Sequence, residues 1–218
     1  MKKSFAFLLL ACLLFQCSNK SALNDFPNTF VMTAEKAKAL GLERVRFHLS
    51  YPNNLEVILP QEGQVNENYL ELIQKQNGKL STSLSLGYGT NFGLAHETAN
   101  PILGEFAKTF LPNLLEQMKV SLQKQYPQAE SITIVEGIWF GQKQPHLRAK
   151  THITDPAKNL DHDILLTIIP IIPPKDQKNG LLLIAQTVLG NSNVATFDDL
   201  PTKGMIAEVW KTFAFDSQ

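Results

Sequence analysis

Cysteine is nearly absent from this 218-residue sequence, since Cys12 and Cys17 are its two cysteines and both lie within the first seventeen residues. The rest of the chain therefore has no thiol, which excludes disulfide bonds, a cysteine nucleophile and a cysteine-ligated zinc site there. A chain of this length buries enough surface to fold without cross-links. We therefore expect core packing alone to supply its stability.

An excess of charge of either sign is also missing, because 20 Lys and Arg residues balance 20 Asp and Glu residues. No basic run occurs after the first positions, which argues against nucleic acid as a partner. The composition is 44% hydrophobic and 18% charged, as in ordinary globular domains. These values predict one globular domain that binds no nucleic acid.

Long hydrophobic runs are missing too. The apolar stretch from Phe5 to Phe15 has eleven residues, whereas a membrane-spanning helix needs about 20. Its length, together with Lys2 and Lys3 before it, is typical of the apolar region of a signal peptide. The chain turns polar immediately after Cys17.

The residues Leu14, Gln16 and Cys17 at the end of this stretch resemble the lipobox of bacterial lipoproteins. The resemblance implies cleavage before Cys17 and attachment of diacylglycerol, and hence palmitate, to its sulfur. Gln16 departs from the small residue that is usual there, and relaxed boxes of this kind are similar to those of spirochaetes and some Bacteroidota. Cys12, after Leu9-Leu10-Ala11, is the alternative lipidated residue, and an ordinary secretory signal is a second alternative.

The resemblance divides the chain into a signal peptide (residues 1–16), a tether (17–30) and a single domain (31–218). It implies a protein of the bacterial cell envelope that its acyl chains attach to the membrane. We expect the outer membrane, with the domain facing the periplasm or the cell surface.

The common catalytic motifs are missing as well. The sequence contains no Gly-x-Ser-x-Gly, no His-Glu-x-x-His and no compact grouping of Ser, His and Asp. Glu136 lies in an apolar segment, but alternation predicts that it points to water or pairs with Arg148 or Lys150 across a hairpin. We expect a domain without enzymatic activity or cofactor that docks an envelope protein or holds a small ligand. The alternatives are a hydrolase-type enzyme with dispersed site residues and a purely structural surface lipoprotein.

Periodicity predicts mixed helices and strands. Asn100 and Pro101 begin the clearest helical stretch, and Pro112 within it should kink or split the helix. Asp198 or Asp199 should cap the final helix. The helices are expected at residues 33–41, 101–124 and from 198 onward, and the strands at 46–52, 55–59, 69–74, 80–86, 131–140, 146–154, 164–172 and 181–189. The last two strands are apolar on both faces, so we expect them at the centre of a covered sheet.

The segments Phe47–Asn54 and Val209–Phe215, in this order of elements, are similar to the opening strand and closing helix of the PsbP-like fold. Bacterial envelope lipoproteins of the DcrB type share that fold. The resemblance implies an α+β domain, with an antiparallel sheet sandwiched by helices, that serves for docking or ligand holding. A shallow apolar patch would favour this function, whereas a deep pocket with convergent Asp, Glu or His would favour an enzyme.

Two apolar groups are candidate partner contacts. The glycine-rich stretch Gly87–Gly93 fits neither a dinucleotide fingerprint nor a P-loop, so we expect a flexible surface loop with Tyr88 and Phe92 as its contacts. Spacing places Trp139 mostly in the core, but its position beside a hairpin tip makes Trp139 and Phe140 the second candidate contact.

Metal-capable side chains gather in one region of the sequence. These are His146, His152, Asp161, His162 and Asp163. His146 and His152 share a face of their strand by alternation, but Arg148 and Lys150 lie between them and would oppose a divalent ion. We therefore expect a solvated polar face and no metal.

Overall fold

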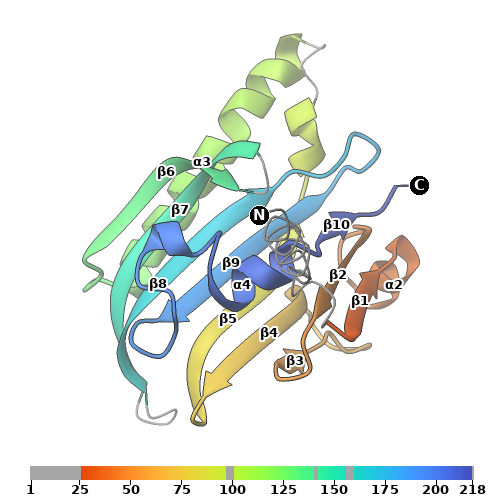
Figure 1. Cartoon of the computed structure of the whole chain (residues 1–218). Helices are drawn as coiled ribbons and strands as arrows, with labels where there is room; N and C mark the ends of the chain where they lie inside the picture. Colours follow the sequence, from red (N-terminus) through yellow and green to blue (C-terminus); the bar gives the residue numbers. More distant parts are fainter. Residues whose placement is uncertain (1–25, 97–100, 140–141, 156–159, 218) are drawn as a thin grey trace, which may run out of the picture.

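Two antiparallel sheets form the framework in the computed structural model, which describes residues 26–96, 101–139, 142–155 and 160–217. The large sheet has seven strands, in the order β3 (Glu56–Ile58), β4 (Asn68–Gln76), β5 (Lys79–Gly89), β9 (Gly180–Val188), β8 (Leu160–Ile171), β7 (Gln142–Asp155) and β6 (Ser131–Trp139). The small sheet has the order β1 (Asn28–Met32), β2 (Phe47–Tyr51) and β10 (Ala214–Phe215). The α+β class expected from the sequence is therefore observed (Figure 1).

The apolar strands β8 and β9 lie at the centre of the large sheet, as their two apolar faces predict. They pair with Ile168 opposite Ile184 and Ile169 opposite Leu183. Alternate residues therefore enter two different cores. Leu183 and Ile169 belong to one core, while Ile168 and Ile184 belong to the other.

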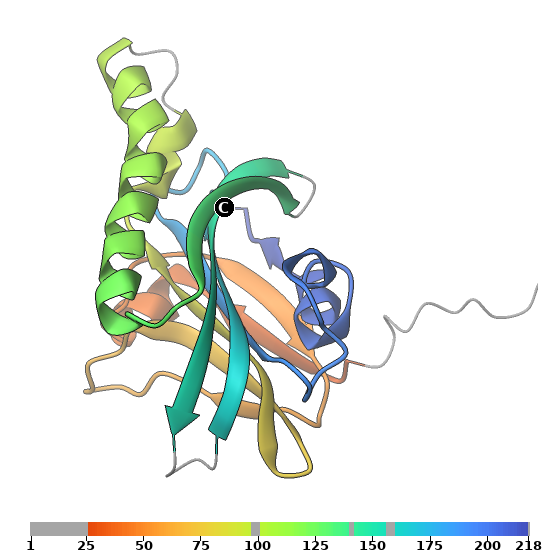
Figure 2. The same cartoon turned by 90° about the vertical axis from the view of Figure 1, so that its left-hand side faces the viewer.

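Helix α3 (Pro101–Gln125) covers one face of the sheet (Figure 2). Its residues Leu115 and Leu122 pack on Leu147, Ala149 and neighbouring side chains of β7 and β8. The helix is continuous through the exposed Pro112, so of the two expected outcomes, a kink or a split, the split is not observed. Packing of Leu115, Met118 and Leu122 on the sheet and contact of Phe110 with Phe92 hold the helix on the two sides of the proline, which removes one backbone hydrogen bond.

The opposite face of the sheet carries the small sheet, helix α2 (Ala34–Ala39) and helix α4 (Gly204–Trp210). The Thr33 side chain caps α2 by accepting a hydrogen bond from the Lys36 N–H at 3.1 Å. The large sheet thus lies between α3 on one side and a mixed layer of helices and strands on the other. Among the described residues, no helix combines the length and apolar character needed to cross a bilayer.

The start of α4 corrects one expectation, because neither Asp198 nor Asp199 caps it. Both belong to a short 3-10 turn, η4 (Phe197–Asp199), and α4 begins five residues later at Gly204. The Asp199 carboxylate instead accepts hydrogen bonds from the N–H groups of Ala195 and Thr196, each at 3.0 Å. Asp199 is the third residue of the turn, and its side chain reaches back to the N–H of Thr196, the residue that caps the turn, as in a capping box.

Candidate functional site

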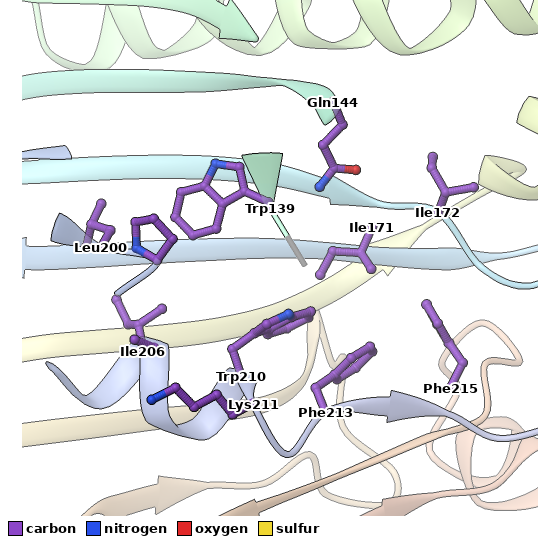
Figure 3. A pocket seen from close by; sticks show the side chains of 12 residues that line it. Trp139, Gln144, Ile171, Ile172, Leu200, Ile206, Trp210, Lys211, Phe213 and Phe215 are labelled. Atoms are coloured by element: carbon purple, nitrogen blue, oxygen red, sulfur yellow. The ribbon is translucent and has the colours of Figure 1, made fainter. Parts of the chain in front are cut away.

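A pocket of about 430 Å³ lies between the β6–β7 hairpin and the segment formed by α4 and β10. The hairpin bends across the sheet toward α4 (Figure 2), which is how residues far apart in the sequence meet. Most of the side chains that line the pocket are apolar, and four are aromatic (Figure 3). The lining residues are Trp139, Gln144, Ile171, Ile172, Leu200, Pro201, Ile206, Ala207, Trp210, Lys211, Phe213 and Phe215.

Three aromatic rings form one wall. Trp210 and Phe213 stack with ring centroids 4.2 Å apart and an interplanar angle of 14°. Phe213 then meets Phe215 edge to face at 5.1 Å. The chain brings the rings together by turning at the end of α4, where the Phe213 N–H donates to the Trp210 carbonyl. Such pairs add stability beyond the burial of their area, so the wall is preformed.

Trp139 forms the opposite wall and is held by His146. The Trp139 Nε1–H lies 3.3 Å from His146 Nε2, and Arg148 Nε donates to the same nitrogen at 3.0 Å. Because two donors point at Nε2, the proton of the neutral ring belongs on Nδ1, which lies 3.4 Å from the Gln144 carbonyl oxygen. The ring fits because residue 137 is glycine, where an added Cβ would lie 2.8 Å from His146 Cε1.

Burial also fixes the charge state of His146. Desolvation lowers the pKa of this imidazole below its ordinary value, and the positive charge of Arg148 lowers it further. Neutral histidine is the form that accepts both hydrogen bonds at Nε2. The pKa shift and the geometry therefore agree that His146 is a structural acceptor behind the Trp139 wall.

The turn that carries Leu200 and Pro201 also lines the pocket. Arg148 ties this turn to the sheet, because its Nη1 lies 3.2 Å from Asp198 and its guanidinium lies 5.4 Å from the Phe197 ring centre. Within the turn, Lys203 and the backbone N–H groups lower the pKa of Asp199 to about 2.

Apart from the indole N–H groups of the two tryptophans, the polar side chains among the described lining residues are those of Gln144 and Lys211. The Lys211 ammonium forms an ion pair with Glu208 at 2.7 Å. None of the described lining residues is Asp, Glu, His or Ser. The lining therefore offers mainly apolar contact surface.

The structure separates the residues that the sequence singled out. Trp139 lies in the pocket wall and is 2% exposed, so the prediction that it is mostly a core residue is confirmed. Tyr88 is 46% exposed, on strand β5 and away from this pocket. Phe92 is buried at 2% exposure, so its ring is not available at the surface. Phe140 and Cys17 lie outside the described residues.

The glycine-rich stretch is packed structure rather than a flexible loop. Strand β5 continues to Gly89, and a Cβ on Gly89 would lie 2.3 Å from the Phe92 ring. Gly93 donates its N–H to the Lys178 carbonyl at 2.8 Å, and a Cβ there would lie 2.4 Å from the Gln177 carbonyl oxygen. These glycines permit close backbone approach.

The metal-capable residues do not converge. His146 is fully buried, whereas His152 is exposed and lies between Asp161 and Asp163, with a ring nitrogen 2.9 Å from each carboxylate. The two carboxylates raise the pKa of His152, which favours the imidazolium form that cannot bind a metal. Within the described segments, no group of three or more His, Cys, Asp or Glu residues could hold a metal ion.

Glu136 is exposed, as alternation predicts, but its partner is different from the expected one. Its carboxylate lies 2.6 Å from Lys143 across the hairpin. Arg148 pairs with Asp198 and Lys150 with Glu130 instead. Glu136 is therefore a surface ion-pair residue.

A second hollow, of about 920 Å³, lies between α2 and the loop before β9 and is lined partly by Tyr88. Its side-chain amides already make internal hydrogen bonds. Gln177 binds the backbone of Arg46, and Asn179 donates to Glu43 and accepts from the Asn91 N–H. Because these polar groups hold the fold together, the aromatic pocket is the stronger candidate for ligand binding.

The chain matches no protein-family model and none of the curated proteins with which it was compared. Its fold and its pocket therefore carry the functional argument.

Sequence reasoning missed most of this pocket. Gln144 had no signal, because a single glutamine in a hairpin is unremarkable. The close spacing of Trp210, Phe213 and Phe215 is visible in the sequence, but spacing typical of a helix indicates a buried face rather than a cavity wall. Only the turn after Trp210 exposes one side of these rings to a cavity.

Proposed function

We propose that the protein is a lipoprotein of the bacterial cell envelope whose domain holds a small apolar ligand in the aromatic pocket, without transforming it. The observation that carries the binding function is the preformed wall of Trp210, Phe213 and Phe215 facing Trp139 across about 430 Å³. Small-ligand sites usually occupy about 300–1,000 Å³ and are lined mainly by apolar and aromatic side chains.

The proposed class within α+β folds is the PsbP-like domain of DcrB-type lipoproteins. An antiparallel sheet covered by α3 on one face, and by α4 with the small sheet on the other, supports this class. The absence of carboxylates and histidines from the described lining supports binding over hydrolysis.

The ligand proposal is tested with N-phenyl-1-naphthylamine, a neutral aromatic probe whose emission rises in apolar sites. We expect saturable binding of one probe per chain, with energy transfer from tryptophan, because the two tryptophans of the chain both line the pocket. Trp210→Ala should weaken probe binding at least tenfold, since it removes half of the stacked pair.

Ile138→Ala is the matched control, because Ile138 is 71% exposed and does not line the pocket. It should bind the probe as the wild type does. Absence of saturable binding, or equal binding by a correctly folded Trp210→Ala protein, would rule out the pocket as the ligand site.

The membrane anchor is proposed from the sequence of the first seventeen residues, with Cys17 as the lipidated residue. Metabolic labelling with palmitate should mark the wild type and the control variant Cys12→Ser. Cys17→Ser should abolish labelling because it removes the acceptor sulfur. Unchanged labelling of Cys17→Ser would refute the assignment, and loss of labelling in Cys12→Ser alone would transfer it to Cys12.

A further inference from the structure

Gln144 is a polar side chain inside an otherwise apolar site. It lies on β7 with only 9% of its surface exposed, and its side-chain amide points into the cavity toward Ile171 (Figure 3). Its backbone carbonyl faces the His146 ring. Within the described segments the side-chain amide is not hydrogen-bonded, and its nitrogen and oxygen are not among the fully buried atoms that lack a partner, so this edge is open to the cavity.

Water in the empty pocket can bond to an amide edge that faces the cavity, and a ligand that displaces this water without replacing its hydrogen bonds would leave the edge unpaired. A carboxamide offers two N–H donors and one carbonyl acceptor on a single edge. A ligand with a matching donor and acceptor would satisfy both at once. A hydrocarbon of the same shape would leave them unsatisfied.

The charge of the lining residues limits the charge that a ligand can carry into the pocket. Lys211 is the one charged group among the described lining residues, and its ammonium is already paired with Glu208. A carboxylate carried into the pocket would lose its hydration without gaining a free cation. The lining therefore favours a neutral ligand.

The shape of the pocket points to a flat ligand. The Trp210 and Phe213 rings are nearly parallel, and Trp139 stands across the cavity from them (Figure 3). Planar rings pack against such walls in offset stacks or edge to face.

We infer that the pocket takes a neutral, flat aromatic ligand with an amide-type edge, and that Gln144 is the residue that selects this edge. The inference rests on the proposed binding function and adds the chemical class of the ligand to it. Sites built to hydrogen-bond a ligand reject analogues that lack the group, because their own buried polar atoms then remain unpaired.

The test compares three ligands that share one ring system, namely naphthalene-2-carboxamide, naphthalene-2-carboxylate and 2-ethylnaphthalene. Isothermal titration calorimetry with the wild-type protein should give roughly tenfold tighter binding of the carboxamide than of the hydrocarbon, from a pair of hydrogen bonds. The carboxylate should bind at least as weakly as the hydrocarbon.

Gln144→Met keeps the length of the side chain but removes its hydrogen-bonding edge. In this variant the carboxamide should lose about tenfold in affinity, while 2-ethylnaphthalene should keep the wild-type affinity or gain slightly. The wild-type series needs no variant, so the inference can fail even if Gln144→Met does not fold.

The outcomes separate the two proposals. If the hydrocarbon and the carboxamide bind equally well to the wild type, the binding function stands and the role of Gln144 is overturned. The same holds if the carboxylate binds most tightly, or if Gln144→Met keeps the full preference for the carboxamide. If none of the three ligands binds, the pocket is not a ligand site and both proposals fall.

Discussion

Replacing His146 tests the reasoning about the pocket wall most directly. His146→Leu removes the nitrogen that accepts from Trp139 Nε1 at 3.3 Å and from Arg148 Nε at 3.0 Å. Each hydrogen bond contributes about 0.5–1.5 kcal/mol net, so the free energy of unfolding should fall by about 1–3 kcal/mol. His146→Gln, whose carboxamide oxygen can still accept, should lose less.

The measurement is urea unfolding at pH 7.5, followed by far-UV circular dichroism so that the altered tryptophan environment does not bias it. The slope of the transition should stay the same, because the surface exposed on unfolding hardly changes. A loss below about 0.5 kcal/mol for His146→Leu, less than one typical hydrogen bond, would refute the role of the imidazole as a shared acceptor.

A pH series provides the second arm of this experiment. Because burial lowers the pKa of His146 in the folded state, the unfolded chain takes up a proton first as the pH falls below the ordinary value of 6.5. The contribution of neutral His146 is therefore complete above pH 6.5 and is lost as the pH falls. The stability difference between wild type and His146→Gln should shrink from pH 7.5 to pH 5. Other histidines titrate in both proteins, so a constant difference would contradict the pKa argument.

Two close-packed glycines and one ion-paired histidine give further predictions, which are checked by unfolding or titration. Gly137→Ala should lower the free energy of unfolding by about 1–3 kcal/mol and shift tryptophan emission, because the new Cβ would lie 2.8 Å from a carbon of the His146 imidazole. Gly87→Ala is the control, since the nearest neighbour of its new Cβ is a movable side-chain oxygen at 3.3 Å. Gly93→Ala should destabilise the protein at least as much, because its Cβ would lie 2.4 Å from the backbone oxygen of Gln177, and a neutral result would contradict the close approach. His152 should titrate by NMR above the ordinary value of 6.5, because flanking carboxylates stabilise its charged form, and a lower pKa would show that these contacts are not made in solution.

The sequence predicted most of the strands because their side chains alternate or are uniformly apolar. The segments 164–172 and 181–189 correspond closely to β8 and β9, and their double-sided apolar pattern correctly placed them at the centre. The Thr33 cap and the end of α3 at Gln125 were also predictable, since caps and prolines act through neighbouring residues.

Features that depend on distant residues were not predictable. The segments β2 and β3 are close in the sequence, yet they belong to different sheets. The stretch from Gly87 to Gly93 was expected to be a loop because glycine suits turns. Its actual role depends on the Lys178 carbonyl and on the Phe92 ring over Gly89, neither of which local spacing reveals.

The candidate site combines both kinds of feature. Spacing placed Trp139 in the core, and Trp139 and Trp210 are both buried. Their position across one cavity depends on the bend of the β6–β7 hairpin and on the turn after α4. The sequence pattern of either segment alone does not predict that the two tryptophans face one cavity.

Because β8 and β9 are buried on both faces, the large sheet separates two hydrophobic cores. Leu115 and its neighbours under α3 lie on one side, and the aromatic pocket lies on the other. Substitutions beneath α3 can therefore raise or lower the stability of the domain without replacing a residue that lines the pocket. In the same way, substitutions in the pocket can change which ligand it prefers while the core beneath α3 keeps the domain folded.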